Sequence, residues 1–325
     1  NIRPFSKEAL SKWTHSLVDL NAANVDAYLA GTFTPPGFDA FSGVAGSVAD
    51  NISVSNEITV SQANNLTAAI RKNPGDTFFL FADILDTQTN TQLATLTASS
   101  VNKITTTLGA SATAEQLKQI NSATIFQINA ASLTTVTGDI SDMVNIGSET
   151  GSFLDNSVFQ NFRNGVAGSA QIAEGSLTFT PTANTQSAAD LKTLNSSATN
   201  ISLSQLQTIS SSSLSDIDDI ATAINAGQFS DATNIATVNV SGSAIDFTTL
   251  QSTIDTYITF NNPTAFVLAG TTTVTLGSQA EVTAFLSDIS DNFLAVSGAN
   301  QAVTVTPAPG GVDISHTDAN SLAAA

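Results

Sequence analysis

The stretch Ser111–Gly138, SATAEQLKQINSATIFQINAASLTTVTG, sets the pattern that the rest of the chain repeats. Leu117 and Ile120 lie three residues apart, which is typical of one face of a helix, and Ile125–Val136 is an extended run rich in Ile, Leu, Val and Thr. Further along, Ser187–Ile209, SAADLKTLNSSATNISLSQLQTI, repeats nearly the same text. The two copies predict a chain built from helix-plus-strand units.

Similar pairs of apolar residues mark six helix-like segments. They are Leu66/Ile70, Leu93/Leu96, Leu117/Ile120, Leu191/Leu194, Leu250/Ile254 and Val282/Phe285. The extended runs that follow them are Thr77–Ala82, Val101–Leu108, Ile125–Asn129, Ile201–Leu206, Ala265–Ala269 and Asn292–Val296. Because this spacing is typical of solenoid coils, we expect an α/β fold, an elongated solenoid-like array of short helix-plus-strand repeats. Tandem β-sandwich domains are the alternative, since short apolar runs fit either architecture.

The first 50 residues differ from the repeats. Ser6 is a candidate N-cap, and a second short helix is expected over Val25–Ala30, ending at Gly31. The apolar stripe that follows Ser6 at helical spacing consists of Leu10, Trp13, Leu17 and Leu20. We expect a helical cap over one end of the array, with a docking helix for another subunit as the alternative.

Composition divides the chain into four segments. Residues 1–50 are the N-terminal helical cap and linker, 51–146 a first repeat block, 147–176 a Gly- and Phe-rich insertion or boundary, and 177–325 a second repeat block that ends in an incomplete repeat. In this last block, Asp313–Ala325 aligns without a gap onto Glu57–Ala69. We expect either that the natural chain continues or that this stub packs on a neighbouring copy, and both predict head-to-tail continuation.

The charge balance is strongly acidic. Asp and Glu outnumber Lys and Arg by 27 to 9, the formal net charge is −18, and no Lys or Arg follows Lys192. Nucleic-acid binding needs clustered cations to replace phosphate counterions, so we exclude it. No apolar run is long enough to span a bilayer, so we expect no transmembrane segment. The acidic surface rich in Ser, Thr and Asn predicts an extracellular protein at the cell surface. The absence of cysteine indicates a bacterial, archaeal or viral product that packing alone stabilises.

No pattern for catalysis or zinc binding occurs. The chain has no Cys and only two His, His15 and His316, which we interpret as structural or exposed, so we expect no enzyme activity. Calcium is the one cofactor for which candidates exist, because carboxylates two or three residues apart offer hard oxygen ligands. The candidates are Asp139, Asp142, Asp216, Asp218, Asp219, Asp288 and Asp291. The alternative for each group is helix capping without a metal. Phe78, Phe79 and Phe81 are expected in the buried core of a strand.

The text from Ser111 to Gly138 resembles the Ala/Thr/Ser-rich repeats of large cell-surface proteins, of S-layer or adhesin type, in marine cyanobacteria and related bacteria. The resemblance extends in style over residues 51–325, and similar repeats occur in viral fibres. It implies an exported structural protein and carries over no functional residue.

These observations together predict an extracellular structural protein that self-assembles head-to-tail into a surface layer, sheath or filament. Its expected partners are copies of itself, with a glycan or a cell-envelope anchor as a further candidate. The alternative function is that of an adhesin or viral fibre that binds a host surface or glycan.

Overall fold

The computed structural model describes residues 17–33, 51–69, 79–99, 102–144, 152–154, 157–165, 169–211, 213–241, 245–258, 265–269, 272–296, 302–305 and 314–324. The chain is a mixed α/β protein with parallel strands in several sheets. It divides into two compact units, one formed by residues 1–136 and 150–173 and the other by 137–149 and 174–325.

The first unit contains a four-stranded parallel sheet whose strand order, β1-β2-β3-β4, follows the chain. Its described elements are β1 (Leu17–Asn21), the 3₁₀ turn η1 (Ala22–Asn24), α2 (Val25–Leu29), β2 (Asn51–Ser55), α3 (Val60–Ala69), β3 (Leu80–Asp83), α4 (Asn90–Leu93), β4 (Asn102–Thr105), β5 (Ser111–Thr113), α5 (Ala114–Ala123), β6 (Ile128–Asn129), α7 (Ser157–Gln160) and β8 (Phe162–Arg163). β7 (Thr135–Gly138) begins in this unit and ends in the second.

Strand register aligns the inward-facing residues of this sheet. Ile52 and Leu80 are partners on adjacent strands, and both are fully buried. The next position in the row is Asn102, also fully buried. Its Nδ2 donates to the carbonyl oxygens of Thr97 (3.2 Å) and Ala123 (3.0 Å), and its Oδ1 accepts from Thr67 Oγ1 (3.1 Å). These bonds offset the cost of burying the amide.

The Gly- and Phe-rich segment contributes an aromatic cluster to the first unit. Phe153 and Phe162 are fully buried, with ring centroids 5.4 Å apart, and Phe159 lies 5.3 Å from Phe153 in an edge-to-face arrangement. β8 pairs in parallel with β6, so strand pairing joins this segment to the rest of the first unit, while ring packing holds the segment itself together.

The second unit contains a five-stranded parallel sheet of order β10-β12-β14-β16-β18 and a three-stranded parallel sheet of order β15-β17-β19, and in it β11 pairs with both β9 and β13. Its described elements are α6 (Ile140–Met143), η3 (Glu174–Ser176), β9 (Thr178–Pro181), β10 (Thr185–Ser187), α8 (Ala188–Ser197), β11 (Ile201–Ser202), β12 (Thr208–Ser211), α9 (Leu214–Asn225), β13 (Phe229–Ser230), η4 (Ala232–Asn234), β14 (Thr237–Val240), β15 (Ile245–Asp246), α10 (Phe247–Ile258), β16 (Ala265–Leu268), β17 (Thr273–Leu276), α11 (Gln279–Ser290), β18 (Leu294–Val296), β19 (Ala302–Val305) and α12 (His316–Ala324).

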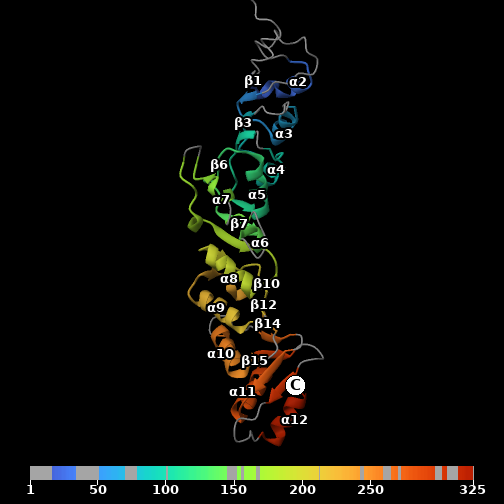
Figure 1. The fold of residues 1–325 in the computed structure, drawn as a ribbon, viewed down its shortest axis with the longest axis vertical. Helices are drawn as coiled ribbons and strands as arrows, with labels where there is room; N and C mark the ends of the chain where they lie inside the picture. Colours follow the sequence, from blue (N-terminus) through green and yellow to red (C-terminus); the bar gives the residue numbers. More distant parts are fainter. Residues whose placement is uncertain are drawn as a thin grey trace, which may run out of the picture. The chain divides into compact units, whose positions relative to one another are not determined.

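One row of apolar residues crosses the five-stranded sheet. Ile209, Val238, Phe266 and Leu294 are register partners on successive strands, and each is at most 1% exposed. The helices between these strands also follow one another, because α8 packs on α9, α9 on α10, α10 on α11 and α11 on α12 (Figure 1). Each helix-plus-strand segment is therefore covered mainly by the segments before and after it.

A hydroxyl side chain marks the start of most helices. Thr113 Oγ1 accepts from the N–H of Gln116, and Gln116 Oε1 accepts from the N–H of Thr113, which is a capping box. A Ser or Thr whose side-chain oxygen accepts a backbone N–H three residues later also precedes α3, α4, α8, α9, α11 and α12, at Thr59, Thr89, Ser187, Ser213, Ser278 and Ser315. Each cap satisfies a backbone donor that the helix leaves unpaired.

The structure confirms most of the expected helices and strands. All six apolar pairs mark helices, although Ile70 lies outside the described residues and Leu96 follows the end of α4. The expected run Ala265–Ala269 contains β16, which spans Ala265–Leu268. The described strand pairs run parallel, which is not the pairing typical of the alternative β-sandwich architecture.

One expectation for the N-terminal segment was wrong in detail. The helical stripe expected through Leu17 and Leu20 ends in a strand, because β1 pairs in parallel with β2; the earlier part of that stripe lies outside the described residues. Leu20 is buried between exposed Asp19 and Asn21, the alternation of a strand. The short helix expected after it is confirmed as α2, and Gly31 follows with a φ of +72°.

Candidate functional site

The aspartates considered for calcium fall into three separate places. Asp139 precedes α6 and Asp142 lies in its first turn, where negative charge stabilises a helix N-terminus. Asp139 makes no side-chain capping bond there. Within the described residues, no group of three or more His, Cys, Asp or Glu side chains is arranged to hold a metal ion.

The second group surrounds an ammonium group of the chain itself. Lys192 Nζ on α8 lies 2.6 Å from Asp216 Oδ1 and 2.7 Å from Asp219 Oδ2 on α9. Its hydrogen bonds to these two carboxylates raise the pKa of Lys192. The positive charge beside Asp216 and Asp219 therefore comes from Lys192 on the preceding helix. Asp218, the third aspartate of this group, is half-buried.

The third group is the most unusual electrostatically. Asp288 on α11 is half-buried, and among the described residues its Oδ2 has no hydrogen-bond partner. Burial, with smaller contributions from the negative charges of Asp255 on α10 and Asp291, raises the pKa of Asp288 to about 6. Asp291 accepts a hydrogen bond from Ser287 (3.3 Å). At neutral pH this face therefore holds carboxylates that repel one another across two helices.

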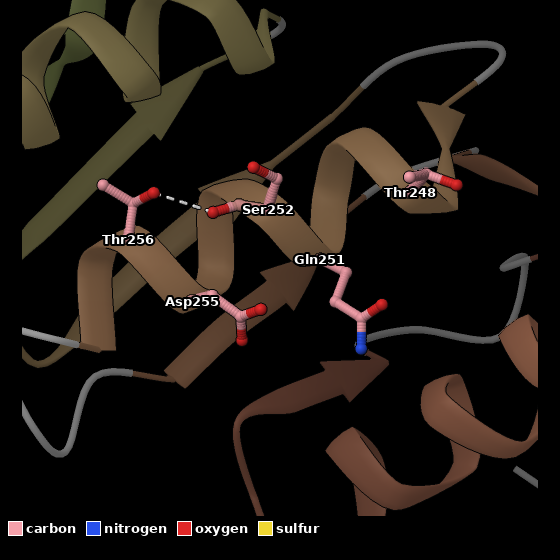
Figure 2. Close-up of a pocket in the computed structure, with 5 residues that line it drawn as sticks. All are labelled: Thr248, Gln251, Ser252, Asp255 and Thr256. Atoms are coloured by element: carbon pink, nitrogen blue, oxygen red, sulfur yellow. Dashed lines mark hydrogen bonds between the residues drawn. The ribbon is translucent and has the colours of Figure 1, made fainter.

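A shallow hollow of about 450 Å³ runs along α10 beside this acidic group. Its described lining consists of Thr248, Gln251, Ser252, Asp255 and Thr256. Figure 2 shows Gln251 and Asp255 projecting from the same side of the helix, while Thr256 donates to the carbonyl oxygen of Ser252 (2.8 Å). This lining offers polar groups that can hydrogen-bond sugar hydroxyls, but it contains no His, Lys or Arg to activate a nucleophile.

The first unit carries a surface cluster of apolar side chains around one cation. We call Phe79, Phe81, Lys103, Ile125 and Phe126 the Lys103 patch. Lys103 Nζ lies 3.7 Å from the ring centroid of Phe79, 4.9 Å from that of Phe81 and 5.9 Å from that of Phe126, within the range of cation–π attraction. Ile125 and Phe126 are the large apolar side chains that the described part of the chain exposes, at 52% and 37%.

The expectation that these phenylalanines lie in the strand core was wrong for Phe79 and Phe81, while Phe78 lies outside the described residues. Leu80 and Ala82 take the inward positions of β3, so Phe79 and Phe81 lie on the outer face and are only half-buried. Phe81 is the register partner of Lys103 on β4. A strand with apolar residues on both faces does not reveal from its sequence which face is buried. The sequence signal that could have identified the outer face was the charged Lys103 on the next strand.

Comparison with known proteins adds no relative: no protein-family model matches this chain, and neither does any of the curated proteins searched. Among the residues that the structure describes, no helix is both long enough and apolar enough to cross a bilayer.

Proposed function

We propose that this chain is an extracellular structural protein that associates head-to-tail with copies of itself into a surface layer, sheath or filament. In this proposal the helix-plus-strand segments are coils of a solenoid, and coils at the two ends of neighbouring copies complete each other. The abundance of Ser, Thr and Asn and the strongly acidic net charge support an exposed, well-hydrated surface.

Bonds between successive segments support the solenoid. On α3, Asn64 Nδ2 donates to the carbonyl oxygen of Thr95 (2.8 Å), and Asn64 Oδ1 accepts from the N–H of Thr97 (2.7 Å). One step further, Asn90 holds the backbone of Gly109 and Ser111 in the same way, at 2.9 and 2.7 Å. An asparagine on one coil thus brackets the backbone of the next, which fixes the spacing between coils.

The observation that carries the proposal is the equivalence of α12 and α3. In the alignment of Asp313–Ala325 with Glu57–Ala69, Asn320 takes the place of Asn64, and Leu322 that of Leu66. The two helices begin at aligned residues. Yet Asn320 is exposed and Leu322 half-exposed, whereas Leu66 is fully buried. Helix α12 therefore exposes an asparagine and a leucine, Asn320 and Leu322, whose counterparts on α3 contact neighbouring segments.

A coil from another copy, docked on α12, would form with Asn320 the same backbone hydrogen bonds that the next coil forms with Asn64 within the chain. Strand edges add to this contact, because β18 and β19 are the last members of their sheets among the described strands. Edge strands with unpaired backbone groups favour the addition of a further parallel strand.

Two substitutions on α12 test the proposal. We expect sedimentation velocity and negative-stain electron microscopy to show polymers of the unmodified chain that lengthen with concentration. Leu322→Asp places a charge on the docking face and should leave short oligomers, whereas Thr317→Asp, a matched control at an exposed position of the same helix, should polymerise normally. A chain that stays monomeric at every concentration would refute the proposal, and so would a Leu322→Asp variant that polymerises like the control.

A second candidate function is that of an adhesin or fibre that binds a glycan. The hollow on α10 favours it, since Gln251 and Asp255 present amide and carboxylate groups side by side (Figure 2). Glycan-array binding by the unmodified chain that is lost in Gln251→Ala would support this function, and the absence of any bound glycan would remove it.

A further inference from the structure

We infer that the Lys103 patch is a lateral docking surface for the acidic second unit of another copy of this chain. The inference rests on the proposed self-assembly and adds a second contact to it. Phe81 and Lys103 are register partners on β3 and β4, so the patch is formed by side chains on the outer face of this sheet and includes none of the residues proposed for the end-to-end contact.

Within the part of the chain that the structure describes, the ammonium group of Lys103 has no carboxylate partner. Lys118 pairs with Glu115 and Lys192 with two aspartates, whereas the Lys103 ammonium group lies against three phenylalanine rings. Stacked rings fix the ammonium group in place while leaving its hydrogen-bonding capacity unused. A carboxylate from outside would meet a preorganised cation.

The Lys103 patch combines this cation with exposed apolar side chains. Ile125 and Phe126 are adjacent in sequence, and the Phe126 ring packs edge to face on Phe81, 6.4 Å between centroids. Aromatic side chains are enriched at protein interfaces, and neighbouring contacts there exclude water from the residues that bind most strongly.

The charge of the two units indicates which surface of another copy would bind the patch. Eight of the nine Lys and Arg residues lie in the first unit, which has 11 Asp and Glu residues, so its formal charge is −3. The second unit has 16 acidic residues and one cation, a formal charge of −15, and that cation, Lys192, is already paired with two aspartates. A second copy therefore offers a strongly acidic surface that complements the patch.

Contact between two Lys103 patches is unfavourable, because it would bring two ammonium groups together without a counter-charge. The contact therefore joins the patch of one copy to a different surface of the other, and such a contact can repeat from copy to copy when its rotation does not close a ring. Combined with end-to-end association, it would join filaments side by side into a sheet.

Zero-length cross-linking identifies the contact directly. A carbodiimide activates a carboxylate, and the Lys103 amine then displaces the activating group as a urea to form an amide. An equimolar mixture of ¹⁵N-labelled and unlabelled chain distinguishes links between copies from links within one copy by mass spectrometry. We expect mixed-label links from Lys103 to Asp or Glu residues of the second unit, and few from Lys118, which is paired with Glu115.

Variants give an independent readout. Lys103→Gln and Phe126→Ser should weaken lateral association about tenfold, so that electron microscopy shows single filaments in place of sheets. Lys118→Gln, which removes the same charge outside the patch, should leave the sheets unchanged. Circular dichroism melting curves confirm that each variant is folded.

The outcomes separate the two proposals. Sheets of unchanged width in both patch variants, or Lys103 links confined to carboxylates of the first unit, overturn the lateral contact while leaving head-to-tail assembly intact. If no filaments form at all, the proposed function fails, and the mixed-label links still decide whether the patch binds another copy. Retention on an acidic polysaccharide column that is lost only in Phe126→Ser, without any mixed-label link, assigns the patch to a glycan and overturns the inference.

Discussion

Replacing Asp288 by asparagine should stabilise the second unit at neutral pH. The pKa of Asp288 is raised from 3.8 to about 6 by burial and by the charges of Asp255 and Asp291. The folded state therefore holds this proton more tightly than the unfolded state, so the free energy of unfolding falls as the pH rises from about 4 to about 6 and stays low above that range. Asparagine keeps the shape of the protonated acid but cannot ionise.

The magnitude follows from the pKa. A tenfold change in proton affinity corresponds to about 1.4 kcal/mol, so the full change would amount to roughly 3 kcal/mol. Because the side chain is only half-buried, water screens much of this, and we expect a gain of about 1 kcal/mol in the free energy of unfolding at pH 7.5. The gain should shrink toward pH 4, because Asp288 is then protonated in the folded state and partly protonated in the unfolded state, where its pKa is 3.8.

Urea unfolding of Asp288→Asn and of the unmodified chain from pH 4 to pH 8 measures this difference. Removing any acid from a chain of net charge −18 relieves some general repulsion, so Asp218→Asn serves as the matched control. Equal gains in the two variants, or a gain for Asp288→Asn that does not change between pH 4 and pH 7, would refute the reasoning. Carboxyl ¹³C shifts of Asp288 give its pKa independently.

Three further predictions concern other polar groups. Asn102→Ala should lower the free energy of unfolding by about 2–4 kcal/mol, because it removes the amide that donates to the carbonyl oxygen of Ala123 in the core. The control Asn65→Ala, on exposed surface, should change the free energy of unfolding by less than about 0.5 kcal/mol. Denaturant titration of both variants measures the difference. Lys192→Met should lower the melting temperature in dilute buffer and have little effect in 1 M salt, since it leaves Asp216 and Asp219 without their shared counter-charge; an equal loss at both salt concentrations would contradict this. A chelator should leave the melting temperature of the purified chain unchanged, because the Lys192 ammonium group already lies between the carboxylates of Asp216 and Asp219. Calorimetry that detects tight calcium binding would contradict this prediction.

The helices were predictable because their buried positions carry similar apolar residues at helical spacing. Leu117, Leu191 and Leu250 are all fully buried, and helical spacing to the next apolar residue identifies the inward face. The helix starts could have been located more sharply, since Thr113-x-x-Gln116 and Ser187-x-x-Asp190 show the capping pattern in the sequence itself.

The short strands were harder to predict because their burial depends on neighbours distant in the chain. Leu17 and Leu20 have a spacing that fits a helix, and only pairing with β2 makes this segment a strand. β12 consists of Thr208–Ser211, whose serines give no apolar signal, and it is fixed by its pairing with β10 and β14.

The candidate sites show the same limit. The grouping of Asp216 with Asp219 was visible from their spacing, but their partner Lys192 lies 24 residues before Asp216 and becomes a neighbour only when α8 packs on α9. Likewise, Phe79 and Phe81 form a surface cluster because Lys103 comes from the next strand and Phe126 from the segment after that. Residues brought together by stacking are not neighbours in the sequence.

The in-register sheet of the second unit has a mechanical consequence. Ile209, Val238, Phe266 and Leu294 lie on strands whose hydrogen bonds all point along the direction in which the strands follow one another. A tensile load applied along that direction would act on these strand contacts in series, and the weakest junction would part first while the others held. The sheet would then yield in discrete steps and dissipate work at each one, as a shock-absorbing tether does.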